Sequence, residues 1–180
     1  MKERRSILFV CTGNICRSPT AEGVLRHLAK ERSLELRIES AGIGDWHIGH
    51  PPDERALRHA KSRGYDLSAQ RARQVRVKDF EEFDMILAMD RGHLEALRRM
   101  ARPHYHAKIR LFVQDFDVPD PYYGGAEGFE QVLDLVEERC RALLQELRLA
   151  SYFLVSTCSS ESSCGSSFGR SRRGRPSCCG

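Results

Sequence analysis

The chain has 180 residues, of which 41% are hydrophobic and 30% are charged, and these proportions argue against a wholly disordered, collagen-like or fibrous protein. The formal net charge is +4, but four arginines and one glutamate after residue 150 contribute +3, which leaves 25 basic and 24 acidic side chains in residues 1–150. A nearly neutral body without a basic helix face argues against nucleic-acid binding. No apolar run approaches the roughly 20 residues that cross a bilayer, so we expect neither a signal peptide nor a membrane span.

The first half of the chain alternates predicted strands and helices. An apolar run over residues 6–11 predicts a strand, and apolar residues at helical spacing after Pro19 predict a helix. A second strand is predicted over residues 36–40, and a helix over 53–63 that is closed by Gly64.

The second half continues this alternation. Residues 83–89 and 108–113 are predicted strands on either side of a helix over 91–100. A loop rich in Asp, Pro, Tyr and Gly follows over residues 115–128, and apolar residues then recur at helical spacing from Phe129 to Leu147. Such alternation predicts an α/β fold in three layers, in which a four-stranded parallel sheet carries helices on both faces and binds ligands beyond the carboxyl ends of its strands.

The predicted domain organisation is a body, residues 1–150, followed by a tail. Residues 151–180 contain ten serines, four glycines and four cysteines with almost no apolar periodicity, so we expect the tail to be disordered. The body contains only Cys11, Cys16 and Cys140, which is not a disulfide scaffold. Without an export signal, we expect a cytoplasmic location where thiols stay reduced unless they do chemistry.

The segment that follows the first strand, Cys-Thr-Gly-Asn-Ile-Cys-Arg-Ser, is the most informative in the chain. Its Gly-Asn pair tolerates left-handed backbone, so successive N–H groups can turn toward one point and lead into a helix N-terminus that favours an anion. Ser18 suits the helix cap, and Pro19 suits the first helical position. We therefore predict that the chain cradles a phosphate between the first strand and the first helix, in a loop that includes Thr12, Gly13, Asn14, Ile15, Cys16 and Ser18.

Two side chains of this loop are suited to take part in a reaction. The amide dipoles and Arg17 are expected to stabilise the thiolate of Cys11, which would make it a nucleophile. The planar guanidinium of Arg17 suits two oxygens of a transferring phosphoryl group. The Ser18 hydroxyl can donate to the sulfur and ease its departure in a second step.

Simpler interpretations of the same residues remain open. Cys11 at the end of a buried strand is also an ordinary small core residue, although a core cysteine needs neither the Gly-Asn turn nor Arg17. Metal binding by Cys11 and Cys16 lacks a third ligand at suitable spacing, so we expect no metal and no cofactor. A nucleotide phosphate loop ends in Gly-Lys-Ser/Thr, which this segment does not.

The pattern of Cys11, five residues and Arg17-Ser18 after the first strand resembles the low-molecular-weight protein tyrosine phosphatases. That family also has an Asp-Pro-Tyr-Tyr segment late in the chain, and Asp120-Pro-Tyr-Tyr123 matches it. Further similar segments lie at residues 40–42, 49–53, 72–74 and 89–90. The resemblance extends from about residue 5 to residue 147, and it implies a phosphatase that hydrolyses phosphotyrosine in proteins and small aryl phosphates.

The resemblance implies a role for each matching residue. Cys11 becomes the nucleophile that forms a phosphocysteine, Arg17 the phosphate clamp, and Asp120 the acid that protonates the leaving oxygen and then activates water. Asp120 before a proline is also an ordinary turn. Trp46 and Tyr122 are implied as aromatic walls of the substrate pocket, although a single tryptophan can also anchor a core.

Other matching residues are implied to support the site. Tyr123 either lines the pocket or is an exposed, phosphorylatable tyrosine. Asn14, Ser18 and Ser40 match a hydrogen-bond network that holds the loop, in which Gln70 replaces the family's histidine. Cys16 matches the second cysteine with which many members protect the nucleophile as a disulfide, or it fills space in a tight loop.

Three other functions agree less well with the sequence. Arsenate reductases of the same fold need further cysteines, and none lies between Cys16 and Cys140. Protein-arginine phosphatases have a threonine where this chain has Ile15. A non-catalytic phosphotyrosine-binding module would not need Cys11 and Asp120 intact. We expect a monomer whose partner is a phosphotyrosine protein substrate.

Overall fold

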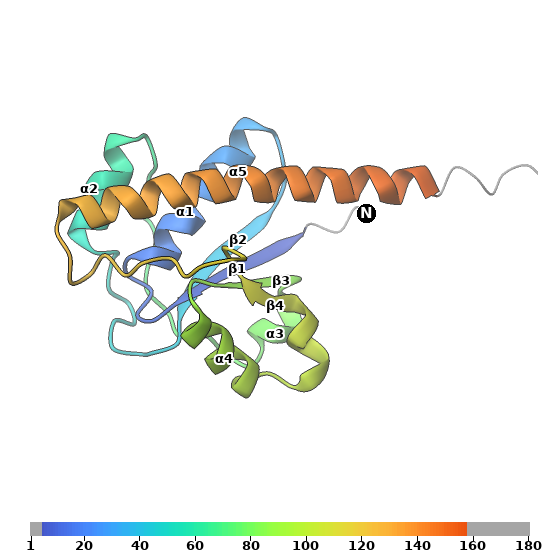
Figure 1. Cartoon of the computed structure of the whole chain (residues 1–180), viewed down its shortest axis with the longest axis horizontal. Coiled ribbons are helices and arrows are strands. Elements are labelled where there is room, and N and C mark those ends of the chain that lie inside the picture. Colours follow the sequence, from blue (N-terminus) through green and yellow to red (C-terminus); the bar gives the residue numbers. More distant parts are fainter. Residues whose placement is uncertain (1–4, 158–180) are drawn as a thin grey trace, which may run out of the picture. The chain divides into compact units, whose positions relative to one another are not determined.

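The computed structural model describes residues 5–157, with side chains through residue 149 (Figure 1). The chain divides into two compact units, Met1–Gln145 and Glu146–Gly180. In chain order the elements are β1 (Ser6–Cys11), α1 (Arg17–Glu31), β2 (Arg37–Gly42), α2 (Glu54–Ser62), α3 (Asp79–Glu82), β3 (Met85–Ala88), α4 (Arg91–Met100), the 3₁₀ helix η1 (Pro103–Lys108), β4 (Ile109–Leu111) and α5 (Ala126–Thr157).

Within the described residues the strands form one parallel sheet in the order β2-β1-β3-β4. Strand β1 lies in its interior and every one of its residues is buried, which explains why its sequence is a continuous apolar run. The chain leaves β1 toward β2 on one side and later returns as β3 on the other. The carboxyl end of β1, where Cys11 pairs with Gly42, is therefore the point where the strand order reverses and ligands bind in such sheets.

Helices cover both faces of this sheet, as the sequence predicted. Within the first unit, Figure 1 shows α1 and residues 126–145 of α5 over one face and α3 and α4 over the other. Helical spacing correctly identified the buried residues of α5 within the first unit, which are Phe129, Val132, Leu133, Val136, Cys140, Leu143 and Leu144. The predicted three-layer α/β fold with a four-stranded parallel sheet is confirmed.

Helix α1 begins earlier than the sequence predicted. Cys16 occupies the N-cap position and Arg17 is the first helical residue, so the prediction that Ser18 caps the helix is wrong. The Ser18 hydroxyl is instead directed to Cys11, Asn14 and the carbonyl of Ala41. Pro19 still lies in the first turn, where the backbone N–H has no helical partner to lose.

Two short elements and several strand ends also differ from the prediction. Helix α3 and η1 are short elements, which leave too little periodicity to recognise. Strands β3 and β4 are shorter than predicted because the apolar residues Phe83 and Phe112 are buried without belonging to a strand. An apolar run therefore marks burial more reliably than it marks pairing.

Helix α5 continues through Thr157, so the boundary predicted after residue 150 falls inside a helix. The physical reason is visible in the sequence, because neither Gly nor Pro occurs between Phe129 and Cys164 to end the helix. The remainder of the predicted tail, residues 158–180, lies outside the described residues.

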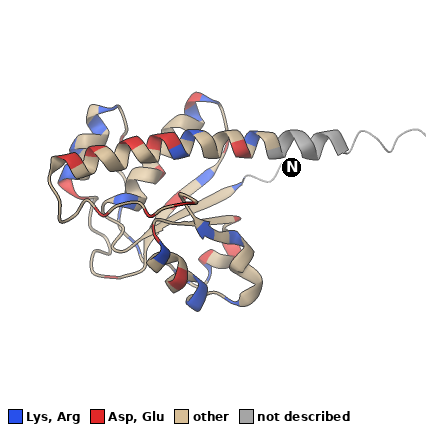
Figure 2. Cartoon of the chain, viewed as in Figure 1, with Lys and Arg blue, Asp and Glu red and all other residues tan. Residues whose placement is uncertain are grey.

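The surface of the described residues carries both signs of charge. Figure 2 shows Lys and Arg interspersed with Asp and Glu on the helices. Among residues 5–157, no helix is long and apolar enough to cross a membrane.

Candidate active site

The loop between β1 and α1 is shaped by close backbone approaches. Asn14 has a φ of 57°, the left-handed conformation that the sequence predicted for it. Gly13 does not use that conformation and is required for space, since a Cβ there would lie 2.8 Å from His47 Cδ2. A Cβ on Gly42 would likewise lie 2.9 Å from the Thr12 carbonyl oxygen. The loop therefore packs directly against the chain that follows β2.

The sulfur of Cys11 lies inside this loop. Its Sγ is 3.0 Å from the Ser18 hydroxyl and accepts a hydrogen bond from the Asn14 backbone N–H at 3.3 Å. Cys11 and Ser18 are buried, so both contacts are shielded from solvent. The predicted contact between the serine hydroxyl and the sulfur is present.

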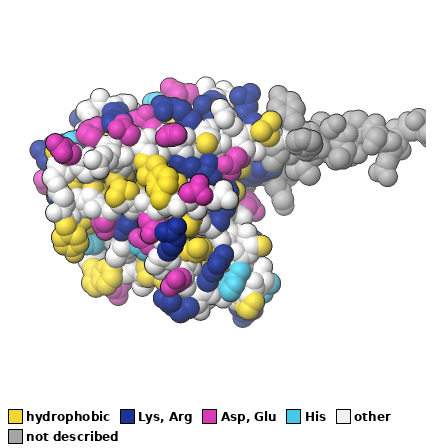
Figure 3. Space-filling view, in the orientation of Figure 1, with side chains coloured by type: hydrophobic (Ala, Val, Ile, Leu, Met, Phe, Trp, Pro, Cys, Tyr) yellow, Lys and Arg dark blue, Asp and Glu magenta, His cyan; other side chains and the backbone are white. Residues whose placement is uncertain are grey.

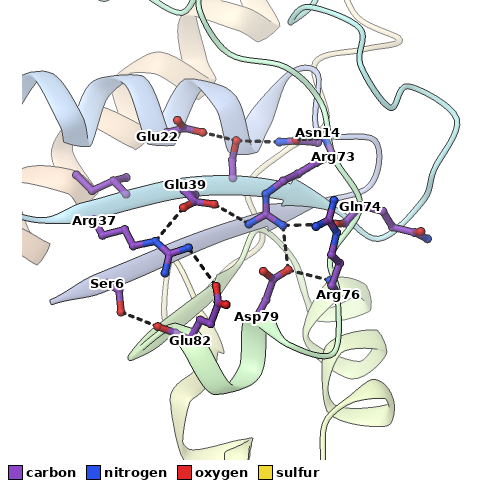
Figure 4. Close-up of polar contacts among 12 residues, drawn as sticks. Ser6, Asn14, Glu22, Arg37, Glu39, Arg73, Gln74, Arg76, Asp79 and Glu82 are labelled. Carbon is purple, nitrogen blue, oxygen red and sulfur yellow. Dashed lines mark hydrogen bonds and ion pairs between the residues drawn. The ribbon is translucent and has the colours of Figure 1, made fainter. Parts of the chain in front are cut away.

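A buried chain of hydrogen bonds supports the loop from behind. The Asn14 side-chain amide donates to the hydroxyls of Ser18 and Ser40, each at 2.9 Å, and its Oδ1 accepts from the Arg73 backbone N–H at 2.9 Å. The Ser40 hydroxyl in turn donates to Glu22 Oε2 at 2.5 Å. Figure 4 shows Glu22 and Asn14 at the two ends of this chain. The network expected of Asn14, Ser18 and Ser40 is thus present and extends further than predicted.

Glu22 and Arg73 are supporting residues that the sequence did not reveal. Burial raises the pKa of the Glu22 carboxyl, although the hydrogen bond from Ser40 opposes the shift. The Arg73 guanidinium donates to Glu39 at 3.0 Å and to Asp79 at 2.9 Å, so the backbone N–H that it offers to the loop is held in place (Figure 4). Glu22 lies on α1, four residues after Ser18, and Arg73 lies in the segment 72–74 that resembles the family, but the sequence indicated no supporting role for either residue.

Gln70 lies outside this network. Its Nε2 donates to the Pro19 carbonyl oxygen at 3.1 Å, and its buried Oε1 has no hydrogen-bond partner among the described residues. It therefore supports the first turn of α1 and, among the interactions described, makes no hydrogen bond to Asn14 or Ser40.

Arg17 is the most heavily bonded side chain of the site. One guanidinium nitrogen, Nη1, donates to Asp90 Oδ2 at 2.9 Å and to the Val118 carbonyl at 3.3 Å. The other, Nη2, donates to Thr12 Oγ1 at 3.0 Å and to Asp120 Oδ2 at 2.8 Å. The guanidinium is buried, and it joins the loop after β1 to the loop that precedes α5.

Asp90 and His93 form a second set of supports that the sequence did not reveal. Asp90 caps α4 by accepting from the His93 backbone N–H at 2.8 Å, and His93 Nε2 is hydrogen bonded to Thr12 Oγ1 at 2.8 Å. Burial by itself raises the pKa of Asp90, but the hydrogen bonds from His93 and the charges of His93 and Arg17 outweigh it and lower the pKa to about 2. The available signal was an aspartate at a helix cap directly after a buried strand.

A pocket of about 330 Å³ opens at this end of the sheet, and it brings together the predicted nucleophile, clamp, acid and aromatic walls. It is lined by Cys11, Thr12, Gly13, Ile15, Cys16, Arg17, Trp46, His47, Asp120, Tyr122 and Tyr123. Trp46 is 68% exposed and Tyr123 is 91% exposed, so neither anchors the core. Figure 3 shows hydrophobic side chains on the surface over the loops before α2 and before α5.

The position of the Trp46 ring depends on the absence of a side chain at Gly44. A Cβ on Gly44 would lie only 1.8 Å from Trp46 Cζ3, so the indole ring occupies the space that any side chain at residue 44 would need. The Gly44 backbone N–H also donates to the Thr12 carbonyl at 2.9 Å. The aromatic wall is therefore built directly on the loop that surrounds Cys11.

The described residues contain no group of three or more His, Cys, Asp or Glu side chains that could hold a metal ion. Cys11, Cys16 and Cys140 are all free thiols in this part of the chain. Burial, followed by the charges of Asp53 and Cys11, raises the pKa of the Cys16 thiol strongly.

Comparison with known proteins places the chain in a family. The model of the family "Low molecular weight phosphotyrosine protein phosphatase" matches residues 6–151. The low molecular weight protein-tyrosine-phosphatase YfkJ of Bacillus subtilis is 44% identical over 151 residues, which cover 79% of this chain and 96% of the relative.

Solved structures give the same result. A protein tyrosine phosphatase from Entamoeba histolytica, crystallised with Hepes in the active site, superposes with a TM-score of 0.78 at 37% identity and covers 82% of this chain and 99% of its own. Vibrio vulnificus Wzb in complex with benzylphosphonate has a TM-score of 0.73 at 36% identity, covering 80% of this chain and 99% of its own. With the family model spanning most of its length, the chain belongs to the low molecular weight phosphotyrosine protein phosphatases.

Proposed function

We propose that this protein is a hydrolase that removes phosphate from phosphotyrosine in proteins, and from small aryl phosphates, through a phosphocysteine intermediate. The observation that carries the proposal is the convergence of Cys11, Arg17 and Asp120 on one pocket, with Arg17 Nη2 2.8 Å from Asp120 Oδ2. Family membership supports the activity. Benzylphosphonate, which Wzb binds, has the shape of an aryl phosphate and supports this class of substrate.

Phosphate binding uses the loop after β1 and the buried arginine. The backbone N–H groups of the loop and the N-terminus of α1 favour an anion. The guanidinium of Arg17 presents a planar pair of donors for two phosphoryl oxygens. A bound phosphate takes over the Arg17 Nη2 donor from Asp120, which frees that carboxyl to face the leaving oxygen.

The first half-reaction transfers the phosphoryl group to sulfur. The Cys11 thiolate attacks phosphorus, the bond from phosphorus to the aryl oxygen breaks, and the carboxylic acid of Asp120 gives its proton to that oxygen. Arg17 and the loop amides stabilise the charge on the equatorial oxygens in the transition state. The products are a phosphocysteine, a phenol and the Asp120 carboxylate.

The second half-reaction returns the enzyme to its starting state. The Asp120 carboxylate accepts a proton from water as the water oxygen attacks phosphorus. The bond from sulfur to phosphorus breaks, and inorganic phosphate and the Cys11 thiolate are released. The Ser18 hydroxyl, 3.0 Å from the sulfur, stabilises this departing thiolate.

The pocket walls give the preference for aromatic phosphates. Trp46 and Tyr122 flank the entrance, where their rings can pack against a phenyl group. A phosphorylated serine has no ring to fill this space and is shorter. Tyr123 extends the same wall toward solvent.

We also propose that Cys16 protects the nucleophile. An oxidant converts the Cys11 thiolate to a sulfenic acid, the Cys16 sulfur attacks it, and water leaves as the disulfide forms. The raised pKa of Cys16 supports this order, because a protonated thiol is not the first to be oxidised. Free cysteines in the described part of the chain are consistent with a reducing cytoplasm, and we propose that the enzyme acts there as a monomer.

The experiment is release of p-nitrophenol from p-nitrophenyl phosphate in the presence of EDTA, with a phosphotyrosine peptide and a phosphoarginine peptide as competing substrates. We expect turnover that is lost in Cys11→Ser and falls by about 10²–10⁴ in Asp120→Asn. Preference for the phosphoarginine peptide would redirect the substrate assignment. No turnover by freshly reduced wild-type protein would refute the proposed phosphatase activity.

A further inference from the structure

Arg55, in the first turn of α2, makes a two-point ion pair that is attached to the phosphate-binding loop. Its Nε and Nη2 donate to Asp53 Oδ1 and Oδ2, each at 3.0 Å. Asp53 caps α2, and its backbone N–H donates to the Ile15 carbonyl at 2.8 Å. The guanidinium of Arg55 is therefore fixed, through one residue, to the loop that surrounds Cys11.

The same guanidinium reaches the loop between β4 and α5, residues 112–125, which we call the acid loop. Arg55 Nη2 also donates to the Tyr122 carbonyl at 3.1 Å, and the guanidinium carbon lies 5.5 Å from the centre of the Tyr122 ring and 4.8 Å from that of Phe129. The Tyr122 backbone N–H donates to Asp120 Oδ1 at 3.1 Å. Residue 122 is thus bonded to Arg55 through its carbonyl and to Asp120 through its N–H.

The contacts of Arg55 are better suited to orienting the acid loop than to stabilising the fold. A bidentate guanidinium is orientationally restricted, which a lysine ammonium is not. Hydrogen bonds from Arg55 lower the pKa of Asp53, so the pair stays ionised at neutral pH. Because the Arg55 side chain is 33% exposed, its ion pair adds little to the free energy of folding, whereas the direction of its donors is well defined.

We propose that Arg55 is a positioning residue for the proton-transfer step, which fastens the segment of Asp120 and Tyr122 to the phosphate-binding loop. The inference rests on the proposed function, since it requires that Asp120 is the proton donor. Asp120 is otherwise tied to the site by Arg17, the donor that a bound phosphate takes over. Arg55 keeps the carboxyl near the leaving oxygen when that tie is released.

This role has a kinetic signature. Phenol and tyrosine are poor leaving groups that require a proton, while p-nitrophenol departs readily as an anion. The quantity kcat/KM reports only the steps up to transfer of the phosphoryl group to sulfur, because hydrolysis of the phosphocysteine is the same for every substrate. If Arg55 positions the acid, Arg55→Ala lowers kcat/KM on phenyl phosphate by roughly tenfold or more and kcat/KM on p-nitrophenyl phosphate by less than about threefold. Arg55→Lys keeps the positive charge but removes the paired donors of the guanidinium, and it gives a loss between those of wild type and Arg55→Ala.

The experiment measures kcat/KM for a series of aryl phosphates with phenols of increasing acidity. The proteins are wild type, Arg55→Ala, Arg55→Lys and Asp120→Asn, and the double variant Arg55→Ala/Asp120→Asn. Arg58→Ala is the matched control, because Arg58 lies one turn later on α2 and is exposed. Thermal unfolding of each protein tests whether it is folded.

The expected result is a steeper dependence of kcat/KM on leaving-group acidity in Arg55→Ala than in wild type. The double variant should show the same dependence as Asp120→Asn, and Arg58→Ala the same dependence as wild type. An equal loss of kcat/KM on all substrates, or a full additional loss of kcat/KM in the Asp120→Asn background, would overturn the proposal and show that Arg55 supports the fold and does not position the acid. A failure of the proposed function looks different, since wild type would then show no turnover or Asp120→Asn would show no loss.

Discussion

The two loops that meet at Arg17 are built in opposite ways. In the loop after β1, the polar side chains Asn14, Arg17 and Ser18 are 2%, 4% and 0% exposed, and all of them have hydrogen-bond partners. In the acid loop, Tyr122 and Tyr123 are exposed. The polar side chains that hold the first loop are buried, whereas the acid loop buries apolar side chains such as Phe112 and Val118 and exposes its two tyrosines.

Several attachments of the acid loop involve charged side chains. The Val118 backbone N–H donates to the Met89 carbonyl at 2.8 Å, and Arg17 donates to Val118 and Asp120. On the α4 side, the Arg91 backbone N–H donates to Asp117 Oδ1 at 3.1 Å.

The difference follows from what each loop binds. A phosphoryl group has the same shape in every substrate, so donors fixed in advance by buried bonds serve all of them. The remainder of a protein substrate varies, and the loop that faces it is exposed. We therefore expect changes behind the first loop to reduce stability and turnover together, and changes in the acid loop to reduce turnover with little loss of stability.

The largest effect is expected from Arg17→Lys. An ammonium cannot donate to Asp90 and to two phosphoryl oxygens in one plane, so kcat should fall by about 10³ or more. Steady-state kinetics on p-nitrophenyl phosphate measures this. A loss of kcat below tenfold would mean that the positive charge alone, without the planar guanidinium, is sufficient for turnover.

Asn14→Ala tests the buried network. The change removes the donors to Ser18 and Ser40 and places alanine at a φ of 57°, and together these cost about 2–4 kcal/mol of unfolding free energy and a large part of turnover. Urea unfolding measures the loss. Asp117→Ala in the acid loop breaks an exposed ion pair and should cost less than about 1 kcal/mol, and comparable losses in the two variants would contradict the difference between the loops.

Asp90 gives the site an acid-dependent contribution to stability. Its pKa is lowered to about 2 in the folded protein, from about 3.9 when unfolded, so its ionised form stabilises the fold above about pH 4. That contribution, at most about 2.6 kcal/mol, is lost as the pH falls from about 4 toward 2. Unfolding of wild type and Asp90→Asn at pH 7 and pH 3 measures it. The variant should lose less stability on acidification, and equal losses would exclude Asp90 as the source.

The smallest effect is expected at the aromatic wall. Gly44→Ala displaces the Trp46 ring, and because that ring is exposed it can move, so stability changes little while KM for p-nitrophenyl phosphate rises roughly two- to tenfold. Gly125→Ala is the matched control in the acid loop, since a Cβ there meets nothing within 4 Å. An unchanged KM in Gly44→Ala would remove Trp46 from the pocket wall.

The sequence predicted the parts of this molecule that are encoded locally. The apolar run of β1 and the Cys-to-Arg segment after it are contiguous, and their meaning does not depend on distant residues. The cap assignment of Ser18 failed because tertiary partners, Cys11 and Asn14, compete successfully for its hydroxyl.

The residues that the sequence did not reveal act across long separations. Glu22, His93 and Arg55 look like ordinary helix residues, and their importance comes from hydrogen-bond partners 18 to 81 positions away in sequence. Gln70 was assigned by its position beside a motif, and the structure directs it to Pro19 instead. Local patterns therefore indicated the groups that we propose to react, but not the groups that hold them.

The most direct test of the account is to trap the intermediate. Asp120→Asn slows the release of the phosphoryl group from sulfur, so mixing this variant with excess p-nitrophenyl phosphate and quenching it should leave the enzyme covalently modified. Mass spectrometry of the digested protein should find one phosphoryl group on the peptide that contains Cys11, and none in Asp120→Asn/Cys11→Ser. A phosphoryl group on another residue, or normal turnover by Cys11→Ser, would contradict the central claim that Cys11 is the nucleophile.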